Sequence, residues 1–430
     1  MRANELRSIL AGRDFRRLYA TRIASQLTDG VFQVALAGYV FFSPERQTTA
    51  GKAAAAFAVT LLPYSALGPF AGVLIDRWRR RQILVWTPIL RAVLVLAVAG
   101  LVAAGQDGVV FFLGVLVVLG VNRFFLAALS AALPHVVSRE QLVTANAFAV
   151  TSGTVIAFTG AGFGYLLRRV FGAGTGGTAL ILVSGAVLFL LAGLIATSLP
   201  RRLLGPHLED VPKQTSEALG SVLHGLVDGA RHIARRRPAA LALAAISFHR
   251  CLYGVILIMT LLLCRNHFTS DADRGLAAFA MMLGVSGAGY FAAALITPPV
   301  VRRISKETWV AWLLAGAAVS LLVLGLPFAE PAWAAGAFAL GVVSQGVKLC
   351  VDTTLQESIE DAYRGRVFAV YDMLFNAMFA AAAAAAAAWL PTDGRSHLTL
   401  AIVIVTYAAG AIAYRATAAR SVQAPVPAPH

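Results

Sequence analysis

The sequence is poor in charged residues and in cysteine. Charged residues make up 13% of the 430 residues and hydrophobic residues 58%, whereas ordinary soluble domains carry about 25% charged residues. So few charges beside so much apolar surface exclude both a water-soluble fold and a disordered chain. The three cysteines, Cys251, Cys264 and Cys350, lie in or at the end of apolar stretches. They form no CxxC pair and no metal-ligand spacing with histidine, which indicates plain apolar residues.

The sequence also lacks the motifs of common soluble enzymes. We find no Walker loop, no GxSxG and no HExxH, so neither ATP hydrolysis nor a hydrolytic site is expected. The first fourteen residues lack the apolar core and small-residue cleavage site of a signal peptide, so the first apolar segment is expected to act as its own insertion signal. The sequence therefore predicts a protein that is not an enzyme and that holds no cofactor and no metal.

Long apolar runs are abundant instead. A hydrocarbon core about 30 Å thick requires about 20 apolar residues per helix. Runs bounded by charge, Gly or Pro predict twelve membrane-spanning helices in two sets of six. They are expected near 18–42, 53–75, 83–104, 109–132, 143–167 and 178–199, and then near 239–264, 275–298, 308–327, 332–354, 367–390 and 397–415.

The two sets of helices predict an all-α membrane protein built from two bundles. A shift of 222 residues places Arg80 and Arg81 over Arg302 and Arg303, which supports a duplication and hence pseudo-symmetry between the bundles. The predicted domains are an N-terminal six-helix bundle at 1–199, a cytoplasmic linker at 200–238, a C-terminal six-helix bundle at 239–418 and a disordered tail at 419–430. Apolar residues near helical spacing at 215–234 predict an amphipathic helix in the linker, either on the membrane surface or solvated.

The basic residues favour one side of the membrane. Of 36 Lys and Arg residues, 24 fall on the side that holds the N-terminus, 7 on the opposite side and 5 inside the predicted spans. This asymmetry predicts that both termini face the cytoplasm. It also accounts for the net charge of +15 without a nucleic-acid partner.

One loop carries a distinctive motif between the second and third spans. Gly72 is followed by Asp76 and Arg77 and then by the basic pair Arg80 and Arg81. This loop resembles motif A of the major facilitator superfamily, although Arg79 stands where that family usually has Gly. The resemblance implies a gating role for these residues, in which Asp76 pairs with an Arg or a helix N-terminus in one conformation and releases it in another. The alternative is that the arginines only fix the topology.

Other segments extend the resemblance over nearly the whole chain. Residues 13–17, 142–146 and 364–366 look like the corresponding segments of drug and siderophore exporters in that superfamily. The fifth span is rich in glycine, as in the antiporters of the family, but lacks their Gly-Pro, so plain small-residue helix packing is an equal interpretation. The resemblance implies two bundles that rock about a central cavity lined by the first, fourth, seventh and tenth spans.

Most polar residues inside the spans lie on those same helices, and Asp372 and Asn376 lie on the eleventh. A charge near the bilayer centre costs about 2.5 to 3.5 kcal/mol, so such residues are expected to be functional. The predicted substrate-cavity residues are Arg22, Gln26, Gln33, Asn122, Arg123, His249, Arg250, Tyr253, Gln345, Lys348 and Asn376. The predicted proton-coupling carboxylates are Asp29, Asp352 and Asp372.

Each carboxylate also has a structural interpretation. Asp29 is the first choice as proton carrier, but it could instead form an ion pair with Arg22 or Arg123. Asp352 and Lys348 are one helical turn apart and could neutralise each other, while Asp372 could serve the gate or pair with Lys348. Arg91, in the third span, is expected to extend its guanidinium to the interface.

These features predict a secondary active transporter of the bacterial cytoplasmic membrane. We expect proton-coupled efflux of amphiphilic small molecules, drug-like compounds or a secreted metabolite, by a monomer in the lipid bilayer. Five basic against three acidic residues inside the spans favour anionic or neutral cargo. The alternatives are a proton-coupled importer of a small organic solute and, in another class, a lipid scramblase or a non-transporting membrane sensor.

Overall fold

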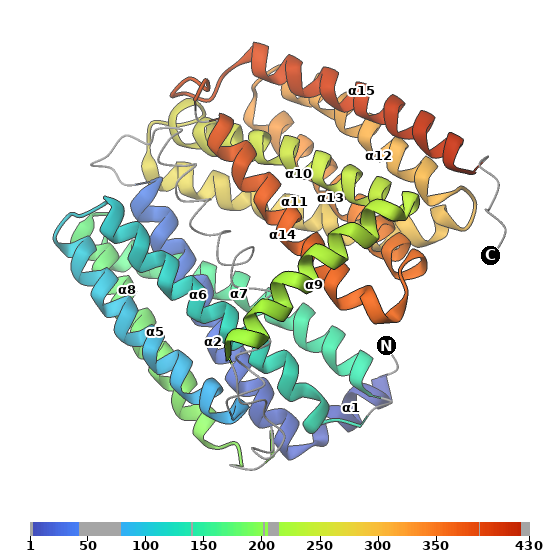
Figure 1. Cartoon of the computed structure of the whole chain (residues 1–430). Coiled ribbons are helices and arrows are strands. Elements are labelled where there is room, and N and C mark those ends of the chain that lie inside the picture. The colour runs from blue at the N-terminus through green and yellow to red at the C-terminus, as the bar shows by residue number, and fades with distance from the viewer. Residues whose placement is uncertain are drawn as a thin grey trace. The chain divides into compact units, whose positions relative to one another are not determined.

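A computed structural model describes residues 3–42, 79–138, 141–200, 203–204, 215–386 and 388–422. Every regular element in these ranges is a helix (Figure 1). The chain divides into two compact units, with the boundary between them at residues 222 and 223. The first unit contains α1 (Ala3–Ala11), α2 (Arg13–Val40), α5 (Arg80–Ala103), α6 (Val109–Ala132), the 3₁₀ turn η1 (Leu133–His135), α7 (Leu142–Phe171) and α8 (Thr175–Thr197).

The second unit begins within α9 (Thr215–Arg235), which runs across the boundary. Two short π-helical segments follow directly on α10 and α12 and lengthen them. The elements are α10 (Arg237–Leu262) with η3 (Leu263–His267), α11 (Ala272–Val301), α12 (Lys306–Ser320) with η4 (Leu321–Gly325), α13 (Glu330–Ser358), α14 (Asp361–Ala386) and α15 (His397–Val422).

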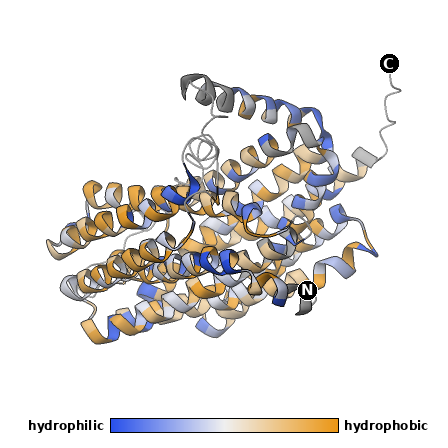
Figure 2. Cartoon of the chain, turned by 90° about the horizontal axis from the view of Figure 1, so that it is seen from below, coloured by the Kyte–Doolittle hydropathy of each residue, from blue (hydrophilic) through white to orange (hydrophobic). Residues whose placement is uncertain are grey.

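These helices lie where long apolar runs predict spans. Each predicted span within the described ranges coincides with a helix, and the span predicted at 53–75 lies outside the described residues. Nine of the described helical segments are long and apolar enough to cross a membrane, and Figure 2 shows apolar residues along most of the helices. α2 and α7 are not among the nine. In α2 the polar residues Gln26, Asp29 and Gln33 lower the mean hydropathy.

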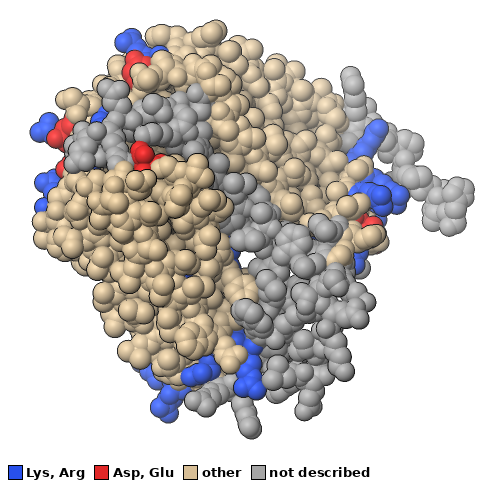
Figure 3. All heavy atoms as spheres, turned by 60° about the vertical axis from the view of Figure 1, so that its left-hand side comes forward, with Lys and Arg blue, Asp and Glu red and all other residues tan. Residues whose placement is uncertain are grey.

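The outer surfaces of the helices are apolar. Large hydrophobic side chains such as Val109, Val170, Leu398 and Ile412 are more than 70% exposed. On the face drawn in Figure 3, the coloured charged residues lie at the edges of the view, and a broad area between them is uncharged. Apolar surface of this extent is stable against acyl chains and unfavourable in water, so these helices are suited to a bilayer.

Within the first unit, α2 and α7 pack with their backbones in close approach. A Cβ atom on Gly160 would lie 2.0 Å from the carbonyl oxygen of Leu27, and one on Gly30 would lie 2.0 Å from that of Ala157. Gly162, two residues after Gly160, has no atom within 4 Å of its Cβ position. The glycines of this predicted fifth span therefore serve small-residue helix packing.

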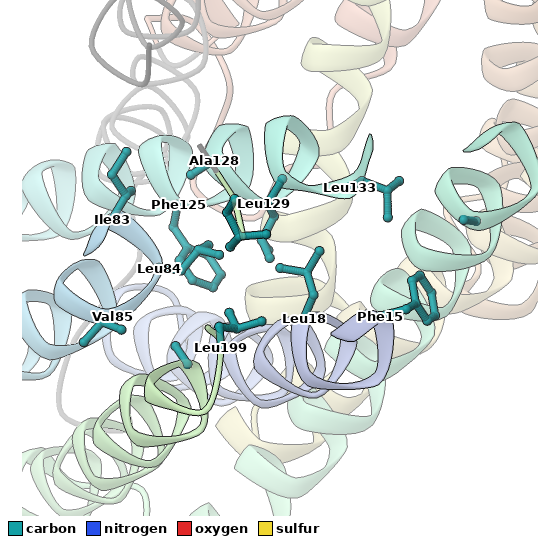
Figure 4. Packing of buried hydrophobic residues seen from close by; sticks show 14 of the residues in the cluster. Phe15, Leu18, Ile83, Leu84, Val85, Phe125, Ala128, Leu129, Leu133 and Leu199 are labelled. Carbon is teal, nitrogen blue, oxygen red and sulfur yellow. The ribbon is translucent and has the colours of Figure 1, made fainter. Parts of the chain in front are cut away.

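The second unit repeats this packing on other helices. α11 and α13 meet at Gly289 and Gly341, whose Cβ atoms would lie 2.2 Å from the carbonyl oxygen of Phe338 and 2.1 Å from that of Ser286. In the first unit, apolar side chains from α2, α5, α6 and the segment after α8 add a buried cluster that includes Leu18, Leu84, Phe125, Leu129 and Leu199 (Figure 4).

The predicted linker helix is present as α9, and the second half of α9 packs against the start of α14. The ring of His232 stacks on Tyr363 with centroids 4.2 Å apart, and Asp228 forms an ion pair with Arg366 at 3.7 Å. Ile233 is buried. This half of α9 therefore contacts protein, so it is not a purely solvated linker helix.

Candidate functional site

A buried ion pair lies in the middle of the first unit. Arg91 of α5 forms a salt bridge with Asp29 of α2. The same guanidinium donates a hydrogen bond to Asn122 Oδ1 of α6 at 3.0 Å and lies 3.5 Å from the hydroxyl oxygen of Ser25. Its carbon Cζ stands 3.9 Å from the ring centroid of Phe189 on α8. Four helices thus meet around one guanidinium.

This cluster is closed to solvent in the structure. Arg91 and Ser25 are 0% exposed, and Asp29 and Asn122 are 5% exposed. A buried charge is tolerated only when an opposite charge and hydrogen bonds compensate it. Arg91 has a carboxylate, an amide oxygen and an aromatic face, so its charge is compensated inside the unit.

The position of Arg91 corrects the sequence prediction. Arg91 was expected to reach the membrane interface, but its side chain is fully buried and pairs with Asp29. Position 91 lies eight residues after position 83, where the span is predicted to begin, which is about 12 Å along a helix. This depth already indicated that the Arg91 side chain begins well inside the span and not at the membrane interface. The partner of Asp29 is Arg91 rather than Arg22 or Arg123.

In the second unit, His249 of α10 connects three helices. Its Nε2 lies 2.7 Å from the hydroxyl oxygen of Ser344 on α13, and its Nδ1 lies 3.1 Å from the hydroxyl oxygen of Tyr407 on α15. His249 is 0% exposed. Both ring nitrogens therefore have a hydroxyl partner, as a neutral buried imidazole requires.

Arg250, the next residue, has a different environment. Its Nε donates a hydrogen bond to the backbone carbonyl of Phe375 on α14 at 3.2 Å. The guanidinium carbon lies 4.0 Å from the ring centroid of Phe375, 4.5 Å from that of Phe379 and 5.8 Å from that of Tyr253. Arg250 is 8% exposed. Among the described residues, no carboxylate forms an ion pair with it.

Lys348 and Asp352 of α13 form the ion pair that their one-turn spacing predicts. Lys348 Nζ lies 2.6 Å from Asp352 Oδ2, and the two side chains are 38% and 24% exposed. The ammonium also stands 5.5 Å from the ring centroid of Tyr371 on α14. This pair, unlike Arg91–Asp29, is accessible to water.

The other predicted site residues are dispersed. Arg22, Gln26, Arg123 and Gln345 are half-buried, whereas Gln33 and Asp372 are exposed. The amide of Asn376 donates a hydrogen bond to the backbone carbonyl of Asp372 at 2.8 Å and so bonds within its own helix.

Part of the predicted gating motif can be placed. Gly72, Asp76 and Arg77 lie outside the described residues. The guanidinium of Arg81 donates hydrogen bonds to the carbonyl oxygens of Leu199 at 2.6 Å and Thr197 at 2.8 Å, at the end of α8. Arg80 lies 3.2 Å from the carbonyl oxygen of Leu204 and 3.2 Å from His135 Nε2. Both arginines thus bind at the C-terminal end of α8 or just beyond it.

An apolar pocket lies in the second unit, between α10, α11, α13 and η4. Tyr253 lines it, and the hydroxyl of Tyr253 lies 3.5 Å from that of Ser286. Thr260 accepts a hydrogen bond from the indole of Trp333 at 2.9 Å in the same wall. The pocket therefore offers an apolar volume with few polar groups, which is typical of small-molecule sites.

Residues 21–384 match the Major Facilitator Superfamily. Two uncharacterized MFS-type transporters, from Mycobacterium bovis and Mycobacterium tuberculosis, are each 38% identical to the chain over 409 residues, which is 95% of this chain and 92% of theirs.

Among solved structures, the nucleoside transporter NupG has a TM-score of 0.61 with 14% identity, over 93% of this chain and 98% of its own. A bacterial homolog of the human lysosomal transporter Spinster, inward-facing and unoccupied, has a TM-score of 0.64 with 12% identity over 100% of both chains. These structures share the helical fold, and with the family match and the mycobacterial relatives they show that the chain belongs to the Major Facilitator Superfamily and is a membrane transporter rather than an enzyme.

Proposed function

We propose that the chain is a proton-coupled exporter of small amphiphilic molecules in the cytoplasmic membrane, with both termini in the cytoplasm. The observation that carries this proposal is the set of ionisable groups in the interior of both units. Arg91 and Asp29 are buried in the first unit, and Arg250 and the Lys348–Asp352 pair lie in the second. Each charge costs about 2.5 to 3.5 kcal/mol at the bilayer centre, and groups of this kind mark substrate and proton pathways.

The two ion pairs support a coupling mechanism in which protonation breaks a salt bridge. A proton on Asp352 or Asp29 would neutralise the carboxylate and weaken its attraction to Lys348 or Arg91. The Lys348–Asp352 pair is partly exposed, so water can deliver a proton to it. Asp29 is 5% exposed, so its protonation requires a conformational opening. Asp372, which is exposed on α14, is the third coupling candidate.

Transport would follow alternating access by two six-helix bundles, residues 1–199 and 239–418, around a shared cavity. Gly72, Asp76, Arg77, Arg80 and Arg81 would form the gate. The bonds from Arg80 and Arg81 to backbone carbonyls near the end of α8 support this role, because they link the predicted gate loop to a neighbouring helix. A proton that moves down 100 mV releases about 2.3 kcal/mol, enough for a roughly fifty-fold gradient of a neutral cargo.

The test is transport in proteoliposomes under an imposed pH gradient. The full chain is reconstituted, and uptake of 2-naphthoate and 2-naphthalenemethanol is followed by fluorescence, with a pH dye inside the vesicles. We expect the gradient to drive accumulation and the dye to report a counterflow of protons. With Asp352→Asn, the probes should still equilibrate across the membrane but should no longer accumulate inside the vesicles. Asp29→Asn should have the same effect if Asp29 also carries a coupling proton.

An exposed carboxylate serves as the control. Glu357→Gln removes an acidic residue whose side chain is 62% exposed and five residues from Asp352; it should couple like the original chain. If the probes accumulate to the same level with and without a pH gradient, proton coupling is ruled out. Proton movement in the same direction as the probe would establish import by symport in place of export.

A further inference from the structure

Arg250 is a buried cation that the described residues do not neutralise. The titratable groups that interact with it electrostatically include Tyr290, Tyr253, Tyr371 and Tyr407 as well as His249, and the four phenols are uncharged at neutral pH. The next residue, His249, bonds to two hydroxyls. A guanidinium held out of water without an anion is costly. A group that supplies the missing negative charge would therefore be bound favourably.

The contacts of Arg250 leave its terminal nitrogens available. Among the described residues its one hydrogen-bond acceptor is the carbonyl of Phe375, which uses the Nε donor. The rings of Phe375 and Phe379 hold the guanidinium at 4.0 Å and 4.5 Å and provide no acceptor atoms. The four N–H groups of the terminal nitrogens are thus free to bind a planar or tetrahedral oxyanion in the bidentate geometry that arginine favours.

The apolar pocket continues from Arg250 along α10. Arg250, Tyr253, Leu257 and Thr260 are spaced by three, four and three residues, which places them on one face of the helix. Tyr253 contacts both sites, because its ring faces the guanidinium and its side chain lines the pocket. A cationic end and an apolar pocket therefore adjoin within one unit.

We propose that Arg250 binds the carboxylate or phosphate of an amphiphilic substrate, whose apolar part occupies the pocket between α10, α11 and α13. This assignment rests on the proposed transport of amphiphiles and narrows the substrate class to anions. The aromatic rings fix the guanidinium in place, so less side-chain entropy is lost when the anion binds. The apolar walls favour a hydrocarbon or aromatic body over a sugar.

Equilibrium binding to the purified full chain in neutral detergent tests the proposal. The probes are 2-naphthoate, 2-naphthyl phosphate, 2-naphthalenemethanol and 2-naphthylmethylammonium, which share one ring system and differ in charge. The original chain should bind the two anions at least about 10-fold more tightly than the alcohol, since hydrogen bonds to charged groups contribute about 1.5–3 kcal/mol. Whichever anion binds more tightly identifies the headgroup as carboxylate or phosphate.

Variants separate the two parts of the site. Arg250→Gln should weaken binding of the anions about 10- to 100-fold and binding of the alcohol less than about 3-fold. The anion affinity of Arg250→Lys should lie between those of the original chain and Arg250→Gln, because lysine keeps the charge but not the planar donors. Ala337→Phe, which fills the pocket, should weaken anions and alcohol alike. Arg274→Gln removes an exposed arginine and should bind all probes normally.

Several results would overturn the assignment. Equal anion affinity in the original chain and Arg250→Gln would remove Arg250 from the site, and equal binding of the ammonium probe would remove anion selectivity. Unchanged binding in Ala337→Phe would place the apolar part elsewhere. If Arg250→Gln does not fold, the affinities of Arg250→Lys and Ala337→Phe for the probes still test the assignment. The binding experiment needs no pH gradient. A failure to find proton coupling in proteoliposomes would therefore contradict the proposed function without changing the outcome of the binding experiment.

Discussion

Each unit buries an arginine, but the surroundings of the two arginines differ. Arg91 is surrounded by Asp29, Asn122 and Ser25 and is completely covered. Arg250, with 8% exposure, has one backbone carbonyl and aromatic rings but no carboxylate among the described residues. A compensated charge holds helices together, whereas an uncompensated one is best explained by a ligand that arrives from outside.

The comparison extends to the residues that the 222-residue shift relates. Asn122 of α6 and Ser344 of α13 are separated by that shift, and each bonds to a buried basic side chain, Arg91 in the first unit and His249 in the second. Both positions are polar, and their partners differ. In the first unit this position supports an ion pair, and in the second it belongs to a hydrogen-bond chain beside Arg250, which has no acidic partner among the described residues.

The largest expected effect comes from breaking the compensated site. Arg91→Met should lower the free energy of unfolding by about 3–5 kcal/mol, because Asp29 would remain buried without its cation. The double variant Arg91→Met with Asp29→Asn should recover much of this loss. Arg250→Met should cost less than about 1 kcal/mol, because no buried anion depends on Arg250. Denaturant unfolding of the full chain in detergent measures all three.

A matching control checks that the loss reflects the ion pair. Asp29→Asn alone should also destabilise the chain, and the two single losses should add up to more than the loss in the double variant. Losses that simply add would show that Arg91 and Asp29 act independently. A loss for Arg250→Met as large as that for Arg91→Met would remove the distinction between the two arginines.

The helices were predictable because the membrane imposes a simple pattern. Apolar runs of about 20 residues have one stable outcome in a bilayer, so each predicted span in the described ranges contains a helix. The one-turn spacing of Lys348 and Asp352 also sufficed to predict their pair, since neighbours on one helix face do not depend on tertiary packing.

The contacts between helices were not predictable from spacing. Asp29 pairs with Arg91 rather than Arg22 or Arg123, and this contact depends on how α2 and α5 pack, which residue spacing within one helix does not specify. Phe375 and Phe379 resemble lipid-facing residues in sequence, yet they pack on Arg250. Tyr407 lies in an otherwise apolar span and gave no sign that it contacts His249.

A smaller effect should follow from the glycines that both units share. Gly160→Ala and Gly289→Ala would each place a methyl group about 2 Å from a carbonyl oxygen of the facing helix. Helices forced apart in this way should lose about 1–3 kcal/mol of stability. The effect should be alike in the two units, because both use the same backbone approach, and thermal unfolding in detergent detects it.

Neighbouring glycines provide matched controls. Gly162 and Gly287 lie two residues from the contacts and have no atom within 4 Å of their Cβ positions. Gly162→Ala and Gly287→Ala should leave stability unchanged or raise it by about 0.5–1 kcal/mol through helix propensity. If they destabilise as much as Gly160→Ala, loss of the close approach is not the cause.

The smallest expected change concerns the accessible ion pair, and it sets the two kinds of charge apart. Lys348→Met or Asp352→Asn should each cost at most about 1 kcal/mol of stability, because partly exposed pairs gain little over their solvated ions and are screened by salt. Unfolding at low and high ionic strength measures this. A loss of about 3 kcal/mol or more would show that the pair contributes to stability as strongly as the buried pair of Arg91 and Asp29.

An ion pair that contributes little to stability can be broken by protonation without loosening the helices around it. Under the proposed coupling, protonation of Asp352 would break only this partly exposed pair, whereas protonation of Asp29 would disturb a contact that joins α2 to α5.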